Sequence, residues 1–154
     1  MPVQDIFLLS TGTGLAPFMS VIKDPETYER FEKVILVHGV RYASELAYKQ
    51  HILDELPNHE YLADEISEKL IYYPTVTREH SKNQGRLTDH ITSGKLCQDI
   101  GLPQLNPTTD RAMICGGPGM LKDTCEILDS MGFVASKHTG DPADYVIERA
   151  FVEK

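Results

Sequence analysis

The stretch Ile6-Phe7-Leu8-Leu9-Ser10-Thr11-Gly12-Thr13-Gly14-Leu15 decides the fold of this chain of 154 residues. Its apolar half predicts a buried strand, and Ala16-Pro17 opens a predicted helix directly after it. The two glycines between them allow a tight turn and a close approach to a bulky anion, at which the N–H groups of a helix start would point. The stretch therefore predicts a phosphate-binding loop of a nucleotide domain; a solvated strand-to-helix turn is the alternative.

The rest of the chain alternates predicted strands with predicted helices. The strands are expected at Asp5–Ser10, Lys33–Gly39, Lys69–Thr77, Arg111–Cys115 and Asp144–Phe151. In the second strand, the uninterrupted apolar run Val34–Val37 is typical of a strand that is covered on both faces. The alternation predicts an α/β fold, a Rossmann-like, doubly wound parallel sheet of five strands in the order 3-2-1-4-5 with helices on both faces.

Three helices can be expected from spacing and capping residues. Apolar residues recur at helical spacing from Ala43 to Leu56 and again over Leu121–Leu128, where Gly132 is suited to end the helix. Asp24 is a typical N-cap for a short helix over Pro25–Phe31, since proline is favoured at the first helical position.

Composition narrows the class of protein. A net charge of −8 argues against a nucleic-acid or anionic-membrane partner, because phosphate groups demand a cationic face. No apolar stretch approaches the ~20 residues that cross a bilayer, and no leader opens the chain. Cys97, Cys115 and Cys125 form no paired or zinc-binding motif, which indicates reduced thiols in the cytoplasm. The histidines form no metal-binding motif either, so no metal is expected.

A second glycine-rich loop, Gly116–Gly119, follows the fourth predicted strand. In the expected sheet the first and fourth strands are neighbours, and ligands bind outside their carboxyl ends. Two such loops at adjacent strand ends indicate a ligand site more specifically than either loop alone. A flexible turn before a helix is the alternative for Gly116–Gly119.

The first loop lacks the features of two common phosphate-binding motifs. The dinucleotide fingerprint requires a third glycine where this chain has Pro17, and a P-loop requires a lysine that is absent here. A flavodoxin-like loop stays open for Ser10–Gly14. Flavodoxins, however, rely on aromatic loops, and this chain has no tryptophan.

Three arginines follow successive strand ends: Arg41, Arg78 and Arg86. Arginine suits a phosphate dianion because its planar guanidinium donates two parallel hydrogen bonds. Charge-assisted bonds contribute about 1.5–3 kcal/mol each, so two would favour NADP over NAD by roughly a hundredfold. The alternative is that these side chains simply pair with neighbours such as Glu45 and Glu79.

Six segments, taken together, resemble one known family. They are Thr11–Phe18, His38–Arg41 with Glu45-Leu46, Val76–Glu79, Gly85–Leu87, Cys115–Met120 and Tyr145–Lys154. In this order they resemble the NADP-binding (C-terminal) domain of bacterial ferredoxin/flavodoxin–NADP reductases, almost from end to end. The resemblance implies that residues 1–154 form one NADP-binding domain.

The resemblance also implies a role for each matching residue. The pyrophosphate would lie on Thr11, Gly12, Thr13 and Gly14, and the adenosine 2′-phosphate among Arg41, Thr77, Arg78 and Arg86. Cys115 and Gly116 would lie under the nicotinamide, within the cofactor-binding loop that continues through Gly117, Pro118 and Met120. Glu148 would lie near flavin and nicotinamide, with Cys115 as the second catalytic residue, and Ala150 would cover the isoalloxazine. Taken without the resemblance, Cys115 could equally be a small apolar core residue.

The chain departs from this family at one end. The reductases begin with a barrel of roughly a hundred residues that binds FAD, whereas only Met1–Gln4 precede the first predicted strand here. The complete enzyme would exchange hydride between NADP(H) and FAD, and single electrons with ferredoxin or flavodoxin. Alone, the domain is expected to bind NADP(H) without turnover. A non-catalytic NADP-sensing module and the nicotinamide domain of another flavin reductase are the alternatives.

Overall fold

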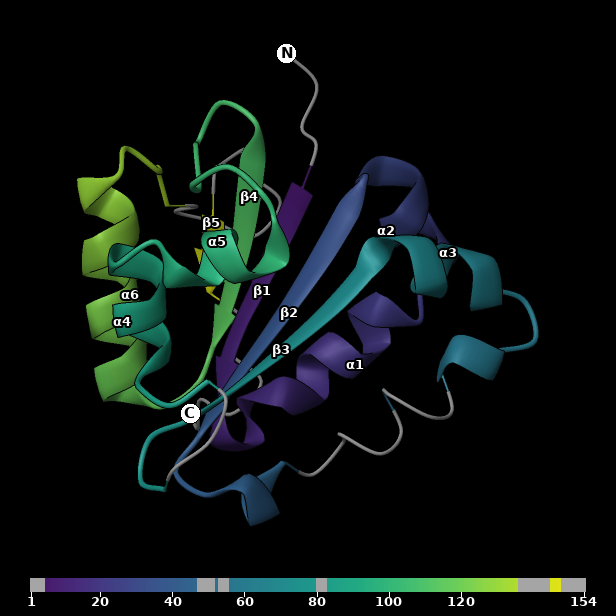
Figure 1. Ribbon diagram of the computed structural model, residues 1–154. Coiled ribbons are helices and arrows are strands. Elements are labelled where there is room, and N and C mark those ends of the chain that lie inside the picture. Colours follow the sequence, from purple (N-terminus) through teal and green to yellow (C-terminus); the bar gives the residue numbers. More distant parts are fainter. Residues whose placement is uncertain (1–4, 47–51, 53–55, 80–82, 136–144, 148–154) are drawn as a thin grey trace, which may run out of the picture.

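The structure, a computed structural model, describes residues 5–46, 52, 56–79, 83–135 and 145–147 (Figure 1). Its centre is a sheet of five parallel strands in the order β3-β2-β1-β4-β5, as predicted. The strands are β1 (Asp5–Thr11), β2 (Lys33–Val40), β3 (Leu70–Val76), β4 (Asp110–Cys115) and β5 (Tyr145–Ile147). All five carboxyl ends therefore lie along one edge of the sheet, which is the lower edge in Figure 1.

The side chains of the three inner strands, β2, β1 and β4, alternate between two apolar layers. Ile6 and Leu8 of β1 belong to one cluster of buried residues, whereas Phe7 and Leu9 belong to the other. Every residue of β1 up to Ser10 is buried, which explains why the sequence of this strand is continuously apolar rather than alternating.

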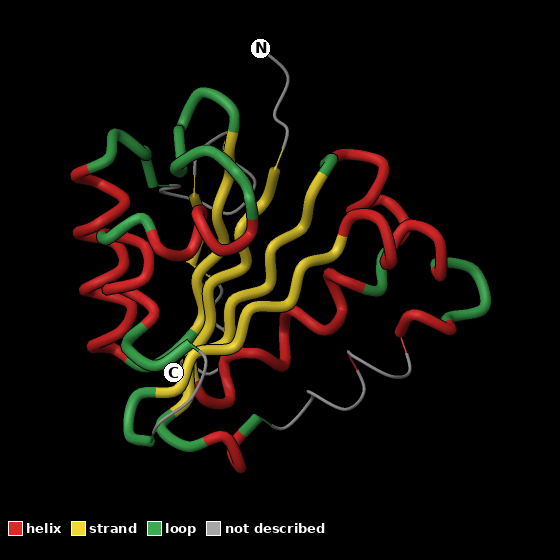
Figure 2. Tube along the Cα trace, in the orientation of Figure 1, coloured by secondary structure: helices red, strands yellow, loops and turns green. Residues whose placement is uncertain are grey.

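Helices cover both faces of the sheet, as Figures 1 and 2 show. On one face lie α1 (Ala16–Ile22), α2 (Pro25–Arg30) and α3 (Ala63–Lys69); on the other lie α4 (Leu87–Thr92), α5 (Lys95–Ile100) and α6 (Pro118–Ser130). Phe18, Tyr28 and Ile66 fill the first layer, and Ile91, Leu96 and Leu128 fill the second. No helix in the described part of the chain is long and apolar enough to span a membrane.

Two predicted helix ends are confirmed in atomic detail. The Asp24 side chain accepts a hydrogen bond of 3.0 Å from the N–H of Glu26 at the start of α2. After α6, Gly132 adopts a φ of +93°, its N–H donates to the Asp129 carbonyl, and the Phe133 N–H donates to the Leu128 carbonyl. These two hydrogen bonds form a Schellman motif, in which glycine is favoured because the residue after the helix must adopt a positive φ.

The predicted helix from Ala43 to Leu56 is wrong at its start. Ala43–Glu45 is a single 3₁₀ turn, and Leu46 leaves the helical region with φ −78° and ψ 78°. Glu45 accepts hydrogen bonds from the N–H groups of Arg41 and Tyr42, so its side chain closes the turn on itself instead of starting a longer helix. Residues 47–51 and 53–55 lie outside the described residues.

Short elements account for the other differences. The predicted strand Lys69–Thr77 starts at Leu70 because Lys69 ends α3, which was not predicted, and α4 and α5 were not predicted either. The fifth strand is described only over Tyr145–Ile147, so the rest of the predicted Asp144–Phe151 lies outside the described residues.

Two buried carboxyl groups lie at the opposite, amino edge of the sheet. Asp5 and Asp110 are register partners on β1 and β4, and both are buried. Burial, followed by the charges of Asp110 and Glu32, raises the pKa of Asp5 from 3.8 to about 6. Burial also raises the pKa of Asp110. Since the folded state favours the neutral form of Asp5, this group stabilises the fold in acid and ceases to do so as the pH rises through about 6.

Replacing Asp5 should therefore alter the pH dependence of stability. We expect the free energy of unfolding of Asp5→Asn, relative to the unmodified chain, to rise by about 2 kcal/mol between about pH 4 and pH 8, because the amide cannot ionise. Urea denaturation across this range measures the difference. Glu29→Gln, at an exposed position on α2, serves as the control. An equal pH dependence in both variants would rule out burial as the cause.

Candidate functional site

The two glycine-rich loops lie against each other at the carboxyl edge of the sheet. β1 and β4 are hydrogen-bonded neighbours, with Ser10 opposite Cys115. A Cβ atom on Gly116 would lie 2.5 Å from Thr11 Oγ1 and 2.8 Å from Met120 Sδ, which is closer than atoms can approach. Gly116 is therefore required for the contact between the loops, as the neighbouring strand ends led us to expect.

The first loop is a 3₁₀ turn, Gly12–Leu15, that leads directly into α1. Gly12 has a φ of +55°, a conformation that other residues rarely adopt. Its carbonyl lies 2.8 Å from His38 Nε2 of β2. The His38 ring is only 1% exposed, and burial lowers the pKa of His38, so the neutral ring donates its Nε2 proton to this carbonyl.

This bond also fixes the next peptide group. In a trans peptide the C=O and the following N–H point in opposite directions. Because the Gly12 carbonyl points at the buried His38, the N–H of Thr13 points away from that ring. The loop can thus present a backbone donor to a bound anion.

A cavity of about 610 Å³ opens beside the first loop, within the size range of ligand pockets. Six of the predicted site residues line it: Thr11, Gly12, Arg41, Thr77, Arg86 and Met120. They come from the ends of β1, β2 and β3 and from the starts of α4 and α6. The structure thus brings together residues that are as far apart in sequence as Thr11 and Met120.

Two of the three predicted arginines share this cavity. Arg41 forms an ion pair of 3.1 Å with Glu45, and Arg86 one of 3.2 Å with Asp123. Both guanidinium side chains are more than 60% exposed, and exposed pairs contribute little free energy, so an incoming phosphate can replace either carboxylate. From the sequence, pairing of Arg41 with Glu45 was the alternative to a place in a phosphate site. In the structure Arg41 both pairs with Glu45 and lines the cavity.

Arg78 does not line the cavity, although its backbone lies beside it. The Arg78 N–H donates to the Arg41 carbonyl over 2.9 Å, so the two residues continue the strands β3 and β2 side by side. The side chain of Arg78 is exposed.

The second loop contributes unequally to the cavity. Met120 lines it, whereas Gly116 and Gly117 lie between β4 and α6 and Pro118 begins α6. Cys115 is buried in the apolar layer under α1, where it acts as a core residue. Its predicted place under a nicotinamide stays a prediction, and Glu148 and Ala150 lie outside the described residues.

Sequence reasoning missed several residues of the site. His38 and Leu87 were noted only as parts of a motif, Glu45 as part of a motif and as a partner of Arg41, and Thr88 was not considered, although all four line the cavity. Asp123 was missed because its pairing with Arg86 spans 37 residues. A histidine at the end of a buried strand was the one available signal for His38.

A parallel sheet with this strand order, and a cavity at its carboxyl edge lined by a glycine loop and arginines, defines a Rossmann-like nucleotide-binding domain. A family model described as oxidoreductase NAD-binding domain matches residues 8–126, and the chain belongs to this family. This confirms the class expected from the sequence.

Similar proteins narrow the comparison further. The chain is 63% identical over its whole length to a ferredoxin–NADP reductase of Azotobacter vinelandii, and 64% identical to one of Pseudomonas aeruginosa. It spans about 60% of the length of each. Its fold also matches a structure described as a ferredoxin NADP+ reductase from Neisseria gonorrhoeae with bound FAD and NADP, with a TM-score of 0.79 and 27% identity. That match covers 96% of this chain and 56% of the other.

The tight contact at Gly116 leads to a stability prediction. Gly116→Ala should lower the free energy of unfolding by about 1–3 kcal/mol, because Thr11 and Met120 must move away from the new methyl group. Gly119→Ala, in α6, meets no atom within 4 Å and should instead raise it by about 0.5–1 kcal/mol through helix propensity. Chemical denaturation of both variants tests this, and equal effects would show that the loops are not in contact.

Proposed function

We propose that this chain is the NADP(H)-binding half of a flavin-dependent ferredoxin/flavodoxin–NADP reductase. It would hold the nicotinamide for hydride exchange with FAD, which a separate domain binds. The relatives named ferredoxin–NADP reductase support this, because they align with the whole chain and are longer than it. The Neisseria structure supports both cofactors, since its description names FAD and NADP as bound.

One observation carries the proposal: Arg41 and Arg86 reach the same cavity from different strand ends. The 2′-phosphate that distinguishes NADP from NAD is a dianion, and two guanidinium groups match its charge and geometry. Arg78, whose backbone is bonded to Arg41, is a third candidate, and the Thr77 hydroxyl is a further possible donor.

The remaining donors of the site suit the rest of the nucleotide. We assign the pyrophosphate to Thr11, Gly12, Thr13 and Gly14, because His38 turns the Gly12 carbonyl inward and leaves the Thr13 N–H directed away from the core. We assign the nicotinamide to the second loop, formed by Cys115, Gly116, Gly117, Pro118 and Met120. Glu148 and Ala150 stay predicted neighbours of the flavin.

In this proposal the chain binds NADP(H) and orients its nicotinamide. FAD would accept the two electrons of the hydride and pass them on singly. Ferredoxin or flavodoxin is the proposed carrier of the complete enzyme, and the FAD-binding domain is the direct partner of this chain. The cytoplasmic location and the lack of a nucleic-acid or membrane partner stay predictions from the sequence.

The arginine assignment can be tested with nucleotide fragments. We expect the chain to bind 2′-phospho-AMP more tightly than 5′-AMP in calorimetric titrations, and Arg86→Ala to weaken only the former, by roughly tenfold to a hundredfold. Arg30→Ala, on α2 away from the carboxyl edge, removes the same charge and should change neither affinity. Equal losses for both fragments would contradict a 2′-phosphate site at Arg86.

The enzymatic role can be tested by reconstitution. In this proposal FAD is held by the flavin domain, so residues 1–154 alone should reduce no dye with NADPH, whereas addition of a separately produced flavin domain and FAD should give NADPH-dependent dye reduction. The flavin domain with FAD but without the chain is the control. Tight NADP binding without turnover at any mixing ratio would favour a non-catalytic sensing module instead.

A further inference from the structure

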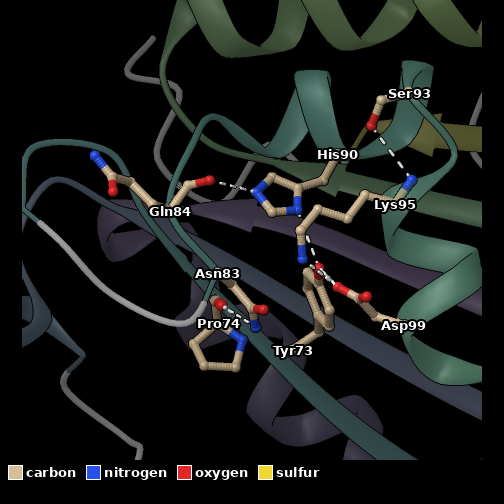
Figure 3. Close-up of polar contacts among 8 residues, drawn as sticks. All are labelled: Tyr73, Pro74, Asn83, Gln84, His90, Ser93, Lys95 and Asp99. Atoms are coloured by element: carbon tan, nitrogen blue, oxygen red, sulfur yellow. Dashed lines mark hydrogen bonds and ion pairs between the residues drawn. The ribbon is translucent and has the colours of Figure 1, made fainter.

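The turn Asn83–Arg86 precedes α4, and Arg86 at its end lines the cavity. Figure 3 shows Asn83 and Gln84 of this turn beside Pro74 and His90. β3 holds this turn from one side. The Val76 N–H donates to the Asn83 carbonyl over 3.1 Å, the Gly85 N–H donates to the Val76 carbonyl over 2.8 Å, and Asn83 Nδ2 donates to the Pro74 carbonyl over 3.1 Å. None of these bonds involves the Gln84 carbonyl, which His90 holds from the other side.

His90 lies one helical turn after Arg86, and its N–H donates to the Arg86 carbonyl over 3.1 Å. Its ring is only 3% exposed, and Nε2 lies 3.1 Å from the Gln84 carbonyl. A Cβ atom on Gly85 would lie 3.2 Å from the same nitrogen, so the ring lies close against the backbone of the turn. His90 thus contacts the turn on two residues just before Arg86.

The hydrogen bonds around Tyr73 determine which protons His90 carries. Hydrogen bonds from Lys95 and Tyr73 lower the pKa of Asp99, which is therefore a carboxylate that can only accept. Tyr73 must donate its single proton to Asp99, and its oxygen can then only accept from His90 Nδ1, 3.0 Å away; Figure 3 draws these contacts as dashed lines.

The other ring nitrogen faces an acceptor as well. A carbonyl oxygen cannot donate, so His90 Nε2 must donate to Gln84. Both nitrogens donate only in the imidazolium form, whose positive charge the Asp99 carboxylate balances across the Tyr73 hydroxyl. A neutral ring has one proton and can make only one of these two bonds by donation.

We infer that His90, as a doubly protonated ring held between Tyr73 and the Gln84 carbonyl, is a positioning residue that sets the place of Arg86 and hence the preference for a 2′-phosphate. This inference rests on the function proposed above. His90 does not itself line the cavity, so it acts through the turn.

The charges around His90 come from every element packed against it. Tyr73 extends from β3, Asp99 and its ion-pair partner Lys95 from α5, Arg86 belongs to the turn, and Asp89 precedes His90 in α4. Asp99, Tyr73 and His90 thus form one chain of hydrogen bonds that leads from α5 to the turn before Arg86.

Variants can separate positioning from general stability. His90→Phe keeps a ring but removes both bonds, and Tyr73→Phe removes only the hydroxyl that orients His90. We expect the ratio of affinities for 2′-phospho-AMP and 5′-AMP to fall about tenfold in His90→Phe and less in Tyr73→Phe. Tyr28→Phe is the matched control, because Tyr28 is also buried and donates to the Ile22 carbonyl, but in the layer on the opposite face of the sheet.

A second measurement needs no folded variant. The ring signals of His90 in the unmodified chain, followed by nuclear magnetic resonance, should show both nitrogens protonated in acid and should shift when 2′-phospho-AMP binds but not when 5′-AMP binds.

The outcomes distinguish the two proposals. If the unmodified chain shows no preference for 2′-phospho-AMP, the proposed function fails. If it shows the preference but His90→Phe and Tyr73→Phe retain it, or Tyr28→Phe loses it equally, the role of His90 is wrong. A single ring proton on His90 in acid, or equal shifts with both nucleotides, would also overturn it.

Discussion

The parallel pairing of β1 with both β2 and β4 is the constraint on which the site depends. Parallel strands bring their carboxyl ends to one edge of the sheet, so the loops that follow these strands lie close together as a result of the strand pairing alone. At that edge Gly116 meets Thr11 so closely that no side chain fits between them. The same register sets His38 of β2 beside the first loop, where it holds the Gly12 carbonyl. The cavity is a consequence of how the sheet is ordered.

Much of this order could be predicted, since it depends on local pattern. The runs that became β1 and β2 are apolar because both faces of the sheet are covered, as is typical of parallel sheets with helices on both sides. The helix expected over Ala43–Leu56 failed at its start because the Glu45 side chain accepts hydrogen bonds from the N–H groups of Arg41 and Tyr42 and so closes a single turn. The spacing of apolar residues does not reveal such competition between a side chain and the helix. Helices of six or seven residues, such as α4 and α5, span too few turns to show a periodic pattern.

The candidate site divides in the same way. Arg41 and Arg86 could be recognised because arginines after strand ends share an edge, whereas the exposed side chain of Arg78 follows the same rule without lining the cavity. The side chains that hold the loops were not recognisable. His38 contacts the Gly12 carbonyl and His90 contacts the Gln84 carbonyl, and both contacts depend on how β2 and α4 pack in the folded chain. The sequence alone does not indicate which backbone group a buried histidine will contact.

These two histidines hold the two sides of one cavity by different protonation states. His38 has one bonded nitrogen, a buried ring and a lowered pKa, so it serves as a neutral donor for the loop at Gly12. The two ring nitrogens of His90 face two acceptors, the Tyr73 hydroxyl oxygen and the Gln84 carbonyl, and the Asp99 carboxylate lies on the far side of that hydroxyl. Both hydrogen bonds therefore require the imidazolium form. The contrast follows from the hydrogen-bond partners, because His38 has one acceptor, the Gly12 carbonyl, whereas both ring nitrogens of His90 face an acceptor. In this acidic chain, positive charge at the carboxyl edge of the sheet therefore lies on the exposed arginines Arg41 and Arg86 and on the buried His90, which contacts the turn before Arg86.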